Sequence, residues 1–284
     1  MAPSQPPSAP DLRAGDEFGG YRVEALLGEG GMGQVYRARS LADGTVVALK
    51  VMKRSLMGTD DHDRRFLREV RAAREIVHRH LVEVLDAGAV EGRRYLVMSY
   101  VPGRSLADRI DQGGALPVDD VLQIVAQVAS GLDALHAAGL VHRDVKSSNI
   151  LLDEARGAVL ADFGLAKHRD YSLLTRAGQV LGTLDYMAPE LIRGEDPGSA
   201  ADRYALACVT FECLAGRPPF GGRSMFAVGM AHLEDEPPDP VAGRDDAPAA
   251  VGEVVRQGLE KDPARRPPTA TAFARMLLVA ARSG

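Results

Sequence analysis

Residues 140–153 read LVHRDVKSSNILLD and place a polar group of side chains between two apolar segments. A surface loop can be this polar, but apolar residues do not usually enclose a surface loop so closely. Burying polar groups costs free energy unless they find hydrogen-bond partners or serve a function. The stretch therefore indicates a polar loop held rigidly near the interior. Its polar side chains are His142, Arg143, Asp144, Lys146 and Asn149.

The size and composition of the chain set broad limits. Its 284 residues suffice for one large domain or two modest ones. A hydrophobic content of 45% supplies a full core, so neither a disordered chain nor a disulfide framework is indicated. The net charge of −5 gives no electrostatic footprint for a nucleic acid, and no nucleic-acid partner is expected.

The cysteines and the N-terminus point to a reducing compartment. Cys208 and Cys213 lie in one apolar helical pattern without a CxxC pair or a nearby histidine, which favours buried thiols over metal or redox chemistry. No apolar run approaches the ~18 residues that a membrane helix requires. Residues 1–16 begin MAPSQPPSAP, which predicts a disordered Pro-rich tail and not a signal peptide. We expect a cytoplasmic location.

The first hundred residues have a strand-like pattern. Short runs rich in β-branched and aromatic residues occupy 21–27, 34–39, 46–52, 81–87 and 93–99, with glycines between them. Residues 64–74 differ, because their apolar side chains at 66, 67, 70 and 73 follow one face of a helix. This pattern predicts a five-stranded sheet with one inserted helix.

The remainder of the chain is predominantly helical. After residues 99–103, amphipathic patterns predict helices at 118–138, 200–215, 225–233, 251–259 and 269–281. The chain is therefore expected to have an α+β fold, with a small β-rich lobe joined by a short hinge to a larger α-rich lobe. Ligand sites favour such interlobe clefts.

A glycine pattern is the first candidate for a binding element. Gly28, Gly30, Gly33 and Val35 fit GxGxxGxV between two predicted strands. Glycines let backbone amides approach phosphates closely. A glycine-rich hairpin explains the pattern equally well in isolation. A dinucleotide fingerprint requires a helix directly after the glycines, whereas QVYRAR continues as a strand.

Lys50 ends the VALK strand soon after this glycine pattern, where its ammonium could reach phosphates. A lysine at the end of an alternating strand is usually solvated, so this position alone carries little information. A buried lysine would need a counter-charge. Glu69 is the best choice, because it shares a helix face with the apolar Phe66 and Ala73.

The order of these motifs carries a resemblance. GxGxxGxV, VALK, the helical Glu69, HRDVKSSN, Asp162-Phe163-Gly164 and Ala188-Pro189-Glu190 follow one another at suitable separations. Across residues 21–281 the chain resembles the eukaryotic-like Ser/Thr protein kinase family of bacterial type. The resemblance implies the protein-kinase-like bilobal fold, with a kinase domain at 17–284, an N-lobe at 17–98, a hinge at 99–103 and a C-lobe at 104–281.

The resemblance also implies catalytic roles. Phosphoryl transfer from ATP requires mainly positioning and charge neutralisation. Asp144 would accept the proton of a Ser or Thr hydroxyl, while Thr183 would bridge Asp144 and Lys146. Asp162 and Asn149 would ligate Mg²⁺, with Mn²⁺ as an alternative. The implied catalytic set is Asp144, Lys146, Lys50, Glu69 and Thr183.

The nucleotide site and the supporting contacts follow from the same resemblance. Glu190 would pair with Arg266, and Asp202 would bond the backbone of the turn at 142–144, while His142 and Phe163 would pack. Met98 would be the gatekeeper residue. The implied ATP-binding residues are Leu27, Gly28, Gly30, Gly33, Val35, Ala48, Lys50, Met98, Tyr100, Val101 and Leu151.

Regulation is implied by basic residues near the site. Arg143 and Lys167 would receive a phosphate, and autophosphorylation is expected on Thr175, with Ser172 second. Three positions depart from the family. Ser99 stands in the hinge where an acidic residue is frequent, Ser147 stands where proline is common, and Ser148 stands where kinases favouring basic substrates often have glutamate.

Two rival functions remain open at this stage. A pseudokinase scaffold would bind nucleotide without catalysis, but such proteins usually lack the counterparts of Lys50, Asp144 or Asp162. A small-molecule kinase would generally lack the LGTLDYMAPE segment. The expected partners are proteins with Ser or Thr acceptors, and the resemblance admits a homodimer during autophosphorylation. A longer parent protein could be membrane-anchored.

Overall fold

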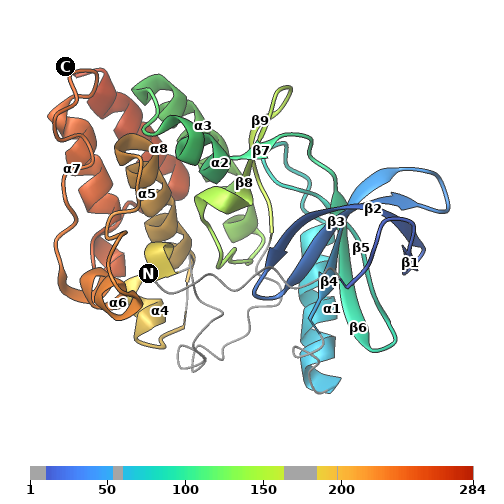
Figure 1. The fold of residues 1–284 in the computed structure, drawn as a ribbon. Coiled ribbons are helices and arrows are strands. Elements are labelled where there is room, and N and C mark those ends of the chain that lie inside the picture. The colour runs from blue at the N-terminus through green and yellow to red at the C-terminus, as the bar shows by residue number, and fades with distance from the viewer. Residues whose placement is uncertain (1–10, 54–59, 163–183, 197, 284) are drawn as a thin grey trace. The chain divides into compact units, whose positions relative to one another are not determined.

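The computed structural model describes residues 11–53, 60–162, 184–196 and 198–283 (Figure 1). Contacts divide the chain into two compact units, Met1–Arg74 with Glu83–Tyr100 and Glu75–Val82 with Val101–Gly284. The boundary after Tyr100 falls inside the segment expected as a hinge. Residues 75–82 belong to the second unit, where Leu81 bridges Leu160 and the His80 ring lies 2.9 Å from the Ala158 carbonyl oxygen. The sequence boundaries had assigned these residues to the first lobe.

The first unit is built on a six-stranded antiparallel sheet in the order β1-β2-β3-β4-β6-β5. The strands are β1 (Glu17–Phe18), β2 (Tyr21–Gly30), β3 (Gly33–Ser40), β4 (Val46–Met52), β5 (Val84–Val90) and β6 (Arg93–Ser99). Helix α1 (Asp60–Arg74) is inserted between β4 and β5 and packs on β5.

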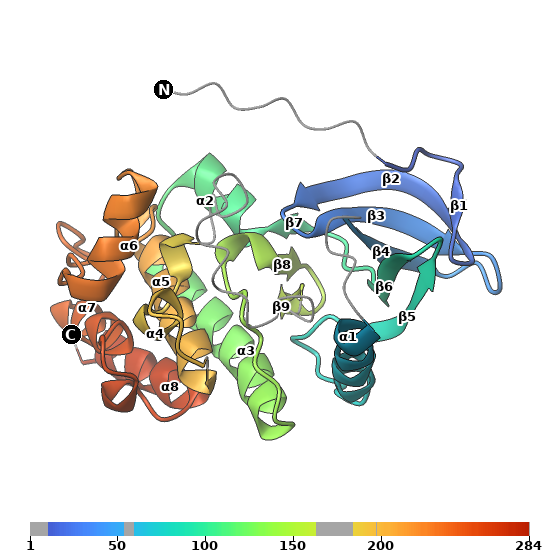
Figure 2. The same ribbon diagram turned by 90° about the horizontal axis from the view of Figure 1, so that it is seen from below.

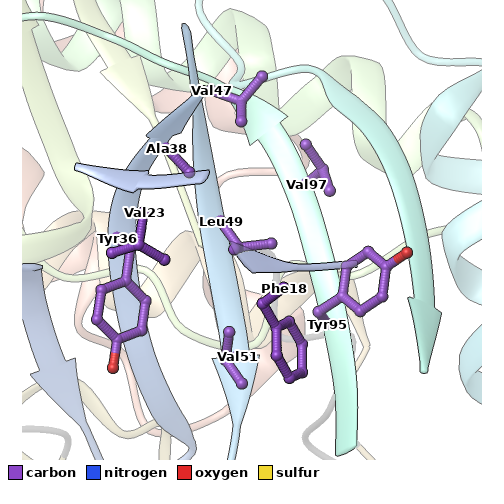
Figure 3. Packing of buried hydrophobic residues seen from close by; sticks show 9 residues of the cluster. All are labelled: Phe18, Val23, Tyr36, Ala38, Val47, Leu49, Val51, Tyr95 and Val97. Carbon is purple, nitrogen blue, oxygen red and sulfur yellow. The ribbon is translucent and has the colours of Figure 1, made fainter. Parts of the chain in front are cut away.

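One face of this sheet forms a hydrophobic core, because alternate residues of a strand point to the same side. Figure 3 shows nine side chains from β1, β2, β3, β4 and β6 gathered in this core. The Phe18 and Tyr95 rings meet edge to face with centroids 5.8 Å apart. The cluster comprises Phe18, Val23, Tyr36, Ala38, Val47, Leu49, Val51, Tyr95 and Val97.

Two details of the sheet differ from the sequence prediction. The sixth strand, β1, has two residues, which is too short to produce a period. Strand β5 spans Val84–Val90 and not 81–87. The apolar Leu81 and Val82 suggested a strand start, but they are buried in the second unit instead. Their burial, and not a strand conformation, explains their apolar character.

The second unit is helical around α3, α5 and α8. Helix α3 packs on both α5 and α8, and α3 and α8 lie beside each other in both views (Figures 1 and 2). The five predicted helices are present within one or two residues at most ends. The helices are α2 (Leu106–Gly113), α3 (Val118–Ala137), α4 (Pro189–Ile192), α5 (Ser199–Ala215), α6 (Met225–Glu234), α7 (Ala249–Gly258) and α8 (Ala270–Ala281).

A small three-stranded sheet adjoins α2 in this unit. It consists of β7 (Arg104–Ser105), β8 (Ile150–Asp153) and β9 (Gly157–Leu160), with β8 in the middle. The sequence prediction missed α2, whose eight residues bury only Leu106 and Ile110. A capping box starts this helix, since Ser105 accepts from the Asp108 amide and Asp108 accepts from the Ser105 amide.

Helix α5 is buried along almost its whole length. Cys208 and Cys213 on this helix are free and fully buried, as the sequence indicates, and burial raises the pKa of both thiols. These thiols are therefore neutral packing groups. Across the described ranges, no helix combines the length and apolar character needed to cross a membrane.

Candidate active site

The polar loop at 142–149 is separated by four residues from the end of α3 at Ala137, and one buried carboxylate fixes it. Asp202, near the start of α5, is 1% exposed, and its two oxygens each accept a backbone N–H at 2.8 Å, one from His142 and one from Arg143. The His136 ring nitrogen Nε2 lies 2.8 Å from the same carboxylate. The predicted contact of Asp202 with this turn is therefore confirmed.

Arg143 adopts a left-handed backbone conformation with φ of 63°. Such a conformation costs a non-glycine residue about 1–2 kcal/mol. The bonds that Asp202 accepts offset this cost by fixing the amides of His142 and of Arg143 itself. Backbone strain of this kind clusters at functional sites. Asp162 also adopts a left-handed backbone conformation, with φ of 62°.

Asp144, Lys146 and Asn149 come together on this loop. The Lys146 ammonium lies 3.2 Å from Asp144 Oδ2. Asn149 Nδ2 donates to the Asp144 carbonyl oxygen at 2.8 Å and to Asp144 Oδ2 at 3.1 Å. Asp144 and Asn149 are each 8% exposed, so the carboxylate is held by neighbours and not by bulk water. The three residues predicted to act together are thus in mutual contact.

The predicted metal ligands lie on neighbouring backbone segments. Residues Ser147–Asn149 form a 3₁₀ turn, and Asn149 accepts the Ala161 N–H at 2.8 Å through its carbonyl oxygen. Asp162 follows Ala161 directly. His142 is 1% exposed and its Nε2 lies 3.1 Å from the Ala161 carbonyl oxygen, so it packs beneath this segment.

The donor set at this place fits a hard divalent cation. Because Asn149 Nδ2 faces Asp144, its Oδ1 is the atom that could bind a cation, together with the Asp162 carboxylate. Mg²⁺ prefers oxygen ligands and is commonly held by one or two carboxylates plus substrate phosphates. The described residues contain no cluster of three or more His, Cys, Asp or Glu that would form an all-protein metal cage.

A buried ion pair supports the segment after residue 183. Arg266 Nη1 and Nη2 donate to Glu190 Oε1 and Oε2 at 2.7 and 2.8 Å, and both residues are under 5% exposed. The Arg266 guanidinium also lies 4.8 Å from the Tyr204 ring centroid. The predicted Glu190–Arg266 pair is confirmed, with the bidentate geometry that makes such pairs strong.

In the first unit, the strand pairing places four of the predicted nucleotide-binding residues on one face of the sheet. Val35 pairs with Lys50, and Ala48 pairs with Met98, so these four side chains lie on the face opposite the hydrophobic core. Lys50 is 5% exposed, and Val35 and Ala48 are half-buried. Glu69 is half-buried on α1 in the same unit. The pairing of Lys50 with Glu69 stays a prediction.

The glycines of the pattern serve different purposes. A Cβ at Gly33 would collide with the Val51 carbonyl oxygen, so the close approach of β3 and β4 requires glycine there. Within the described residues, a Cβ at Gly28 or Gly30 would meet no atom within 4 Å, and neither glycine has a positive φ. Internal packing does not explain these two glycines, which is consistent with space kept for a ligand.

The hinge residues lie on both sides of the unit boundary. In the first unit, Ser99 and Glu83 exchange bonds, with Ser99 Oγ accepting the Glu83 N–H at 3.0 Å. The hydroxyl of Ser99 therefore has a structural role that its sequence position did not suggest. The Arg37 guanidinium lies 5.6 Å from the Tyr100 ring centroid. Val101 in the second unit is buried.

The remaining predicted residues fall into two groups. Leu27 on β2 is 47% exposed, and Leu151 on β8 is half-buried between Ser105 and Val159. Arg143 is half-buried at the loop. Phe163, Lys167, Ser172, Thr175 and Thr183 lie outside the described residues.

The sequence left Ser147 and Ser148 unexplained and did not reveal a role for Glu212. Ser147 is 2% exposed and bonds to Tyr186 and Glu212, whereas Ser148 is exposed. Glu212 lies 65 positions from Ser147. Glutamate inside the apolar pattern of a buried helix was the one available signal, because such a charge needs partners.

Comparisons with known proteins agree with this geometry. The family model described as protein kinase domain matches residues 21–277. The chain is 40% identical over 256 residues to the serine/threonine-protein kinase PknE of Mycobacterium tuberculosis, covering 90% of this chain and 45% of that protein. It is 40% identical over 264 residues to the serine/threonine-protein kinase pkn3 of Myxococcus xanthus, covering 89% and 48%.

A solved structure extends the likeness to the fold. The PknI kinase domain of Mycobacterium tuberculosis matches with a TM-score of 0.77 and 34% identity, over 95% of this chain and 99% of that one. The chain spans less than half the length of the curated relatives it matches. With residues 21–277 matched and the catalytic loop in place, the chain belongs to the protein kinase domain family, among the bacterial eukaryotic-like serine/threonine kinases.

Proposed function

We propose that this chain transfers the γ-phosphate of ATP to Ser or Thr hydroxyls of proteins. The observation that carries the proposal is the mutual contact of Asp144, Lys146 and Asn149 on a loop whose backbone is fixed by Asp202. This arrangement provides a carboxylate to receive a proton, an ammonium to stabilise developing negative charge, and an amide oxygen for a cation.

The transfer step assigns one task to each residue. The acceptor oxygen forms a bond to the γ-phosphorus while the bond from that phosphorus to the β–γ bridging oxygen breaks, and ADP leaves. Asp144 takes the hydroxyl proton and releases it to solvent. The Lys146 ammonium, 3.2 Å from Asp144, would stabilise the charge on the transferring group.

The nucleotide and the metal would be held by the residues that the family resemblance assigns to them. Gly28, Gly30 and Lys50 would hold the phosphates, while Val35, Ala48 and Leu151 would contact the base. Asp162 and Asn149 would hold Mg²⁺, or Mn²⁺ as an alternative, and the cation supplies charge neutralisation when bound. The remaining residues proposed for the nucleotide are Leu27, Gly33, Met98, Tyr100 and Val101.

The direct test is phosphate transfer to a generic protein. The chain is incubated with Mg-[γ-³²P]ATP and a mixed protein acceptor, and the labelled amino acids are identified. We expect phosphoserine and phosphothreonine with the wild type and none with Lys50→Met. Nucleotide binding without any transfer would favour the pseudokinase alternative. Label appearing only on small molecules would favour a small-molecule kinase.

We also propose that the domain activates itself by phosphorylating Thr175 and, secondarily, Ser172, with two copies meeting during the reaction. Arg143, half-buried beside the catalytic carboxylate, supports this because a guanidinium binds phosphate strongly. Lys167 would be a second basic contact. Mass spectrometry after incubation with Mg-ATP tests it, and the absence of phosphate between residues 165 and 183 would refute it.

We place this activity in the cytoplasm. ATP and Mg²⁺ are supplied there, and the two free buried thiols Cys208 and Cys213 suit a reducing compartment. Fractionation of cells followed by detection of the kinase domain tests the location. Recovery of the domain on the outer side of the membrane would contradict it.

A further inference from the structure

Ser147 lies inside the catalytic loop, between Lys146 and Asn149, yet its side chain belongs to a different set of contacts. It is 2% exposed. Its Oγ donates to Glu212 Oε1 at 3.1 Å and lies 3.0 Å from the Tyr186 hydroxyl. Tyr186 OH in turn donates to Glu212 Oε2 at 2.7 Å. The three side chains form a closed triangle of polar contacts in the interior of the second unit.

The protons of this triangle can be counted. Two hydroxyls supply two protons for three contacts when Glu212 is ionised. Protonation of Glu212 would supply the third and would reverse its bond with Tyr186: Glu212 would then donate to Tyr186, Tyr186 to Ser147, and Ser147 to Glu212. Buried polar networks are stable only when every member is satisfied. The neutral carboxylic acid therefore completes the triangle, and the carboxylate leaves one contact without a proton.

The surroundings raise the pKa of Glu212. Burial raises the pKa of this carboxyl from its ordinary value of 4.5, while the bonds from Tyr186 and Ser147 oppose that rise. Asp111 on α2 and Asp185 beside Tyr186 add negative charge nearby and raise the pKa further.

The position of Glu212 gives the triangle a mechanical role. Asp202 and Glu212 both lie on α5, ten residues and therefore about 15 Å apart along the axis. Asp202 holds the amides of His142 and Arg143, and Glu212 holds Ser147 at the other end of the loop. Helix α5 thus contacts the catalytic loop at two places, before Asp144 through Asp202 and after Lys146 through Glu212.

The contacts of the Ser147 side chain also restrict the backbone around it. Ser147 opens the 3₁₀ turn, and its carbonyl oxygen accepts the N–H of Ile150. Asn149, in the same turn, bonds to Asp144 through its side chain. A shift of Ser147 would therefore move Asn149 and Asp144 together.

We propose that Ser147 is a positioning residue for phosphoryl transfer, which fixes the second end of the loop carrying Asp144 and Lys146 through its contacts with Glu212 and Tyr186. This inference rests on the proposed function of Asp144. Ser147 does not touch the reacting atoms in this proposal, so its effect passes through the geometry of the loop.

The first test compares Ser147→Ala with a matched control. Thr210→Val also removes a fully buried hydroxyl of the second unit, which donates to the Leu206 carbonyl oxygen at 2.8 Å on the same α5. We expect both variants to lower the urea midpoint. Ser147→Ala should lower kcat about 10-fold with KM for ATP unchanged, because misplacement by ~1 Å costs up to about 10²-fold. Thr210→Val should retain the wild-type kcat.

The second test uses Glu212, where an amide can replace the neutral acid. In Glu212→Gln, Oε1 accepts from Ser147 and Nε2 donates to Tyr186, so the triangle stays complete. We expect Glu212→Gln to keep kcat within about twofold of wild type and Glu212→Ala to lose about 10-fold. Because the wild type loses the third proton as pH rises through the raised pKa, the kcat ratio of Glu212→Gln to wild type should increase with pH.

The outcomes separate this inference from the function on which it rests. Wild-type kcat in a folded Ser147→Ala chain, with Asp144→Asn inactive in the same assay, would overturn the inference and leave the function intact. An equal loss in Ser147→Ala and Thr210→Val would also overturn it, since stability alone would then explain both. A wild-type chain that transfers no phosphate would overturn the proposed function and this inference together.

Discussion

Replacing Asp202 with asparagine tests how the catalytic loop is held. The carboxylate accepts two backbone N–H groups at 2.8 Å and contacts the His136 ring. The amide retains one acceptor oxygen and turns an NH₂ group toward the other N–H. One charge-assisted bond is lost and one buried donor is left unsatisfied, which together should cost about 3 kcal/mol of unfolding free energy.

The same change should affect the reaction more than the stability loss alone explains. The left-handed backbone of Arg143 costs free energy that these bonds offset, so we expect the loop to shift without them, and Asp144 with it. A shift of ~1 Å can cost on the order of 10²-fold in rate. Urea unfolding and kcat for phosphate transfer to a peptide measure the two effects under conditions where the variant is folded.

Asp133→Asn provides the matched control. The Asp133 carboxylate on α3 also accepts two backbone N–H groups, from Ala270 and Thr271 at 2.9 Å each, where it caps α8. Replacing the Asp133 carboxylate should lower the free energy of unfolding by about 1–2 kcal/mol, because Asp133 is only half-buried. It should leave kcat unchanged. A folded Asp202→Asn chain with wild-type kcat would refute the claim that Asp202 positions the loop.

Three further changes have defined outcomes. Burial lowers the pKa of His232 to about 3, so between pH 6.5 and 3 the unfolded chain binds a proton that the folded chain does not, and stability falls as the pH drops. His232→Gln should reduce this pH dependence of the unfolding free energy, measured with urea, by up to about 1.4 kcal/mol per pH unit. Equal pH dependence in the wild type and the variant would contradict this. Gly33→Ala should lower the melting temperature measurably, whereas Gly30→Ala should keep it and raise KM for ATP; the reverse order would refute the roles given to these glycines. Arg266→Leu leaves Glu190 buried without its partner and should cost about 3–5 kcal/mol by chemical denaturation, so a loss below ~1 kcal/mol would argue against a stabilising pair.

The sequence was most informative where local pattern and burial coincide. The helix at 118–138 was predicted within one residue of α3, because its apolar stripe continues for five turns. The catalytic loop was recognised because apolar residues enclose a run of polar ones, and the structure buries Asp144 and Asn149 as this pattern requires. The contacts of Asp202 and of Glu190 with Arg266 followed from the family resemblance.

Sequence patterns failed where short elements or distant contacts decide the outcome. Helix α2 buries two residues in eight, which is too weak a periodicity to detect. The apolar Leu81 and Val82 suggested the start of a buried strand, but both are buried in the second unit instead. The triangle of Ser147, Tyr186 and Glu212 joins residues 26 to 65 positions apart, and no local spacing reveals such a contact.

The central claim is that Asp144 receives the acceptor proton, and the rate of one turnover in Asp144→Asn tests it most directly. The substitution keeps the side-chain shape but removes the carboxylate that would accept the proton and that pairs with Lys146 at 3.2 Å. The account predicts a loss of about 10²–10⁴-fold in the rate of phosphate transfer, with ATP binding unchanged. A rate within about twofold of the wild type would contradict the assignment of Asp144 and the mechanism built on it.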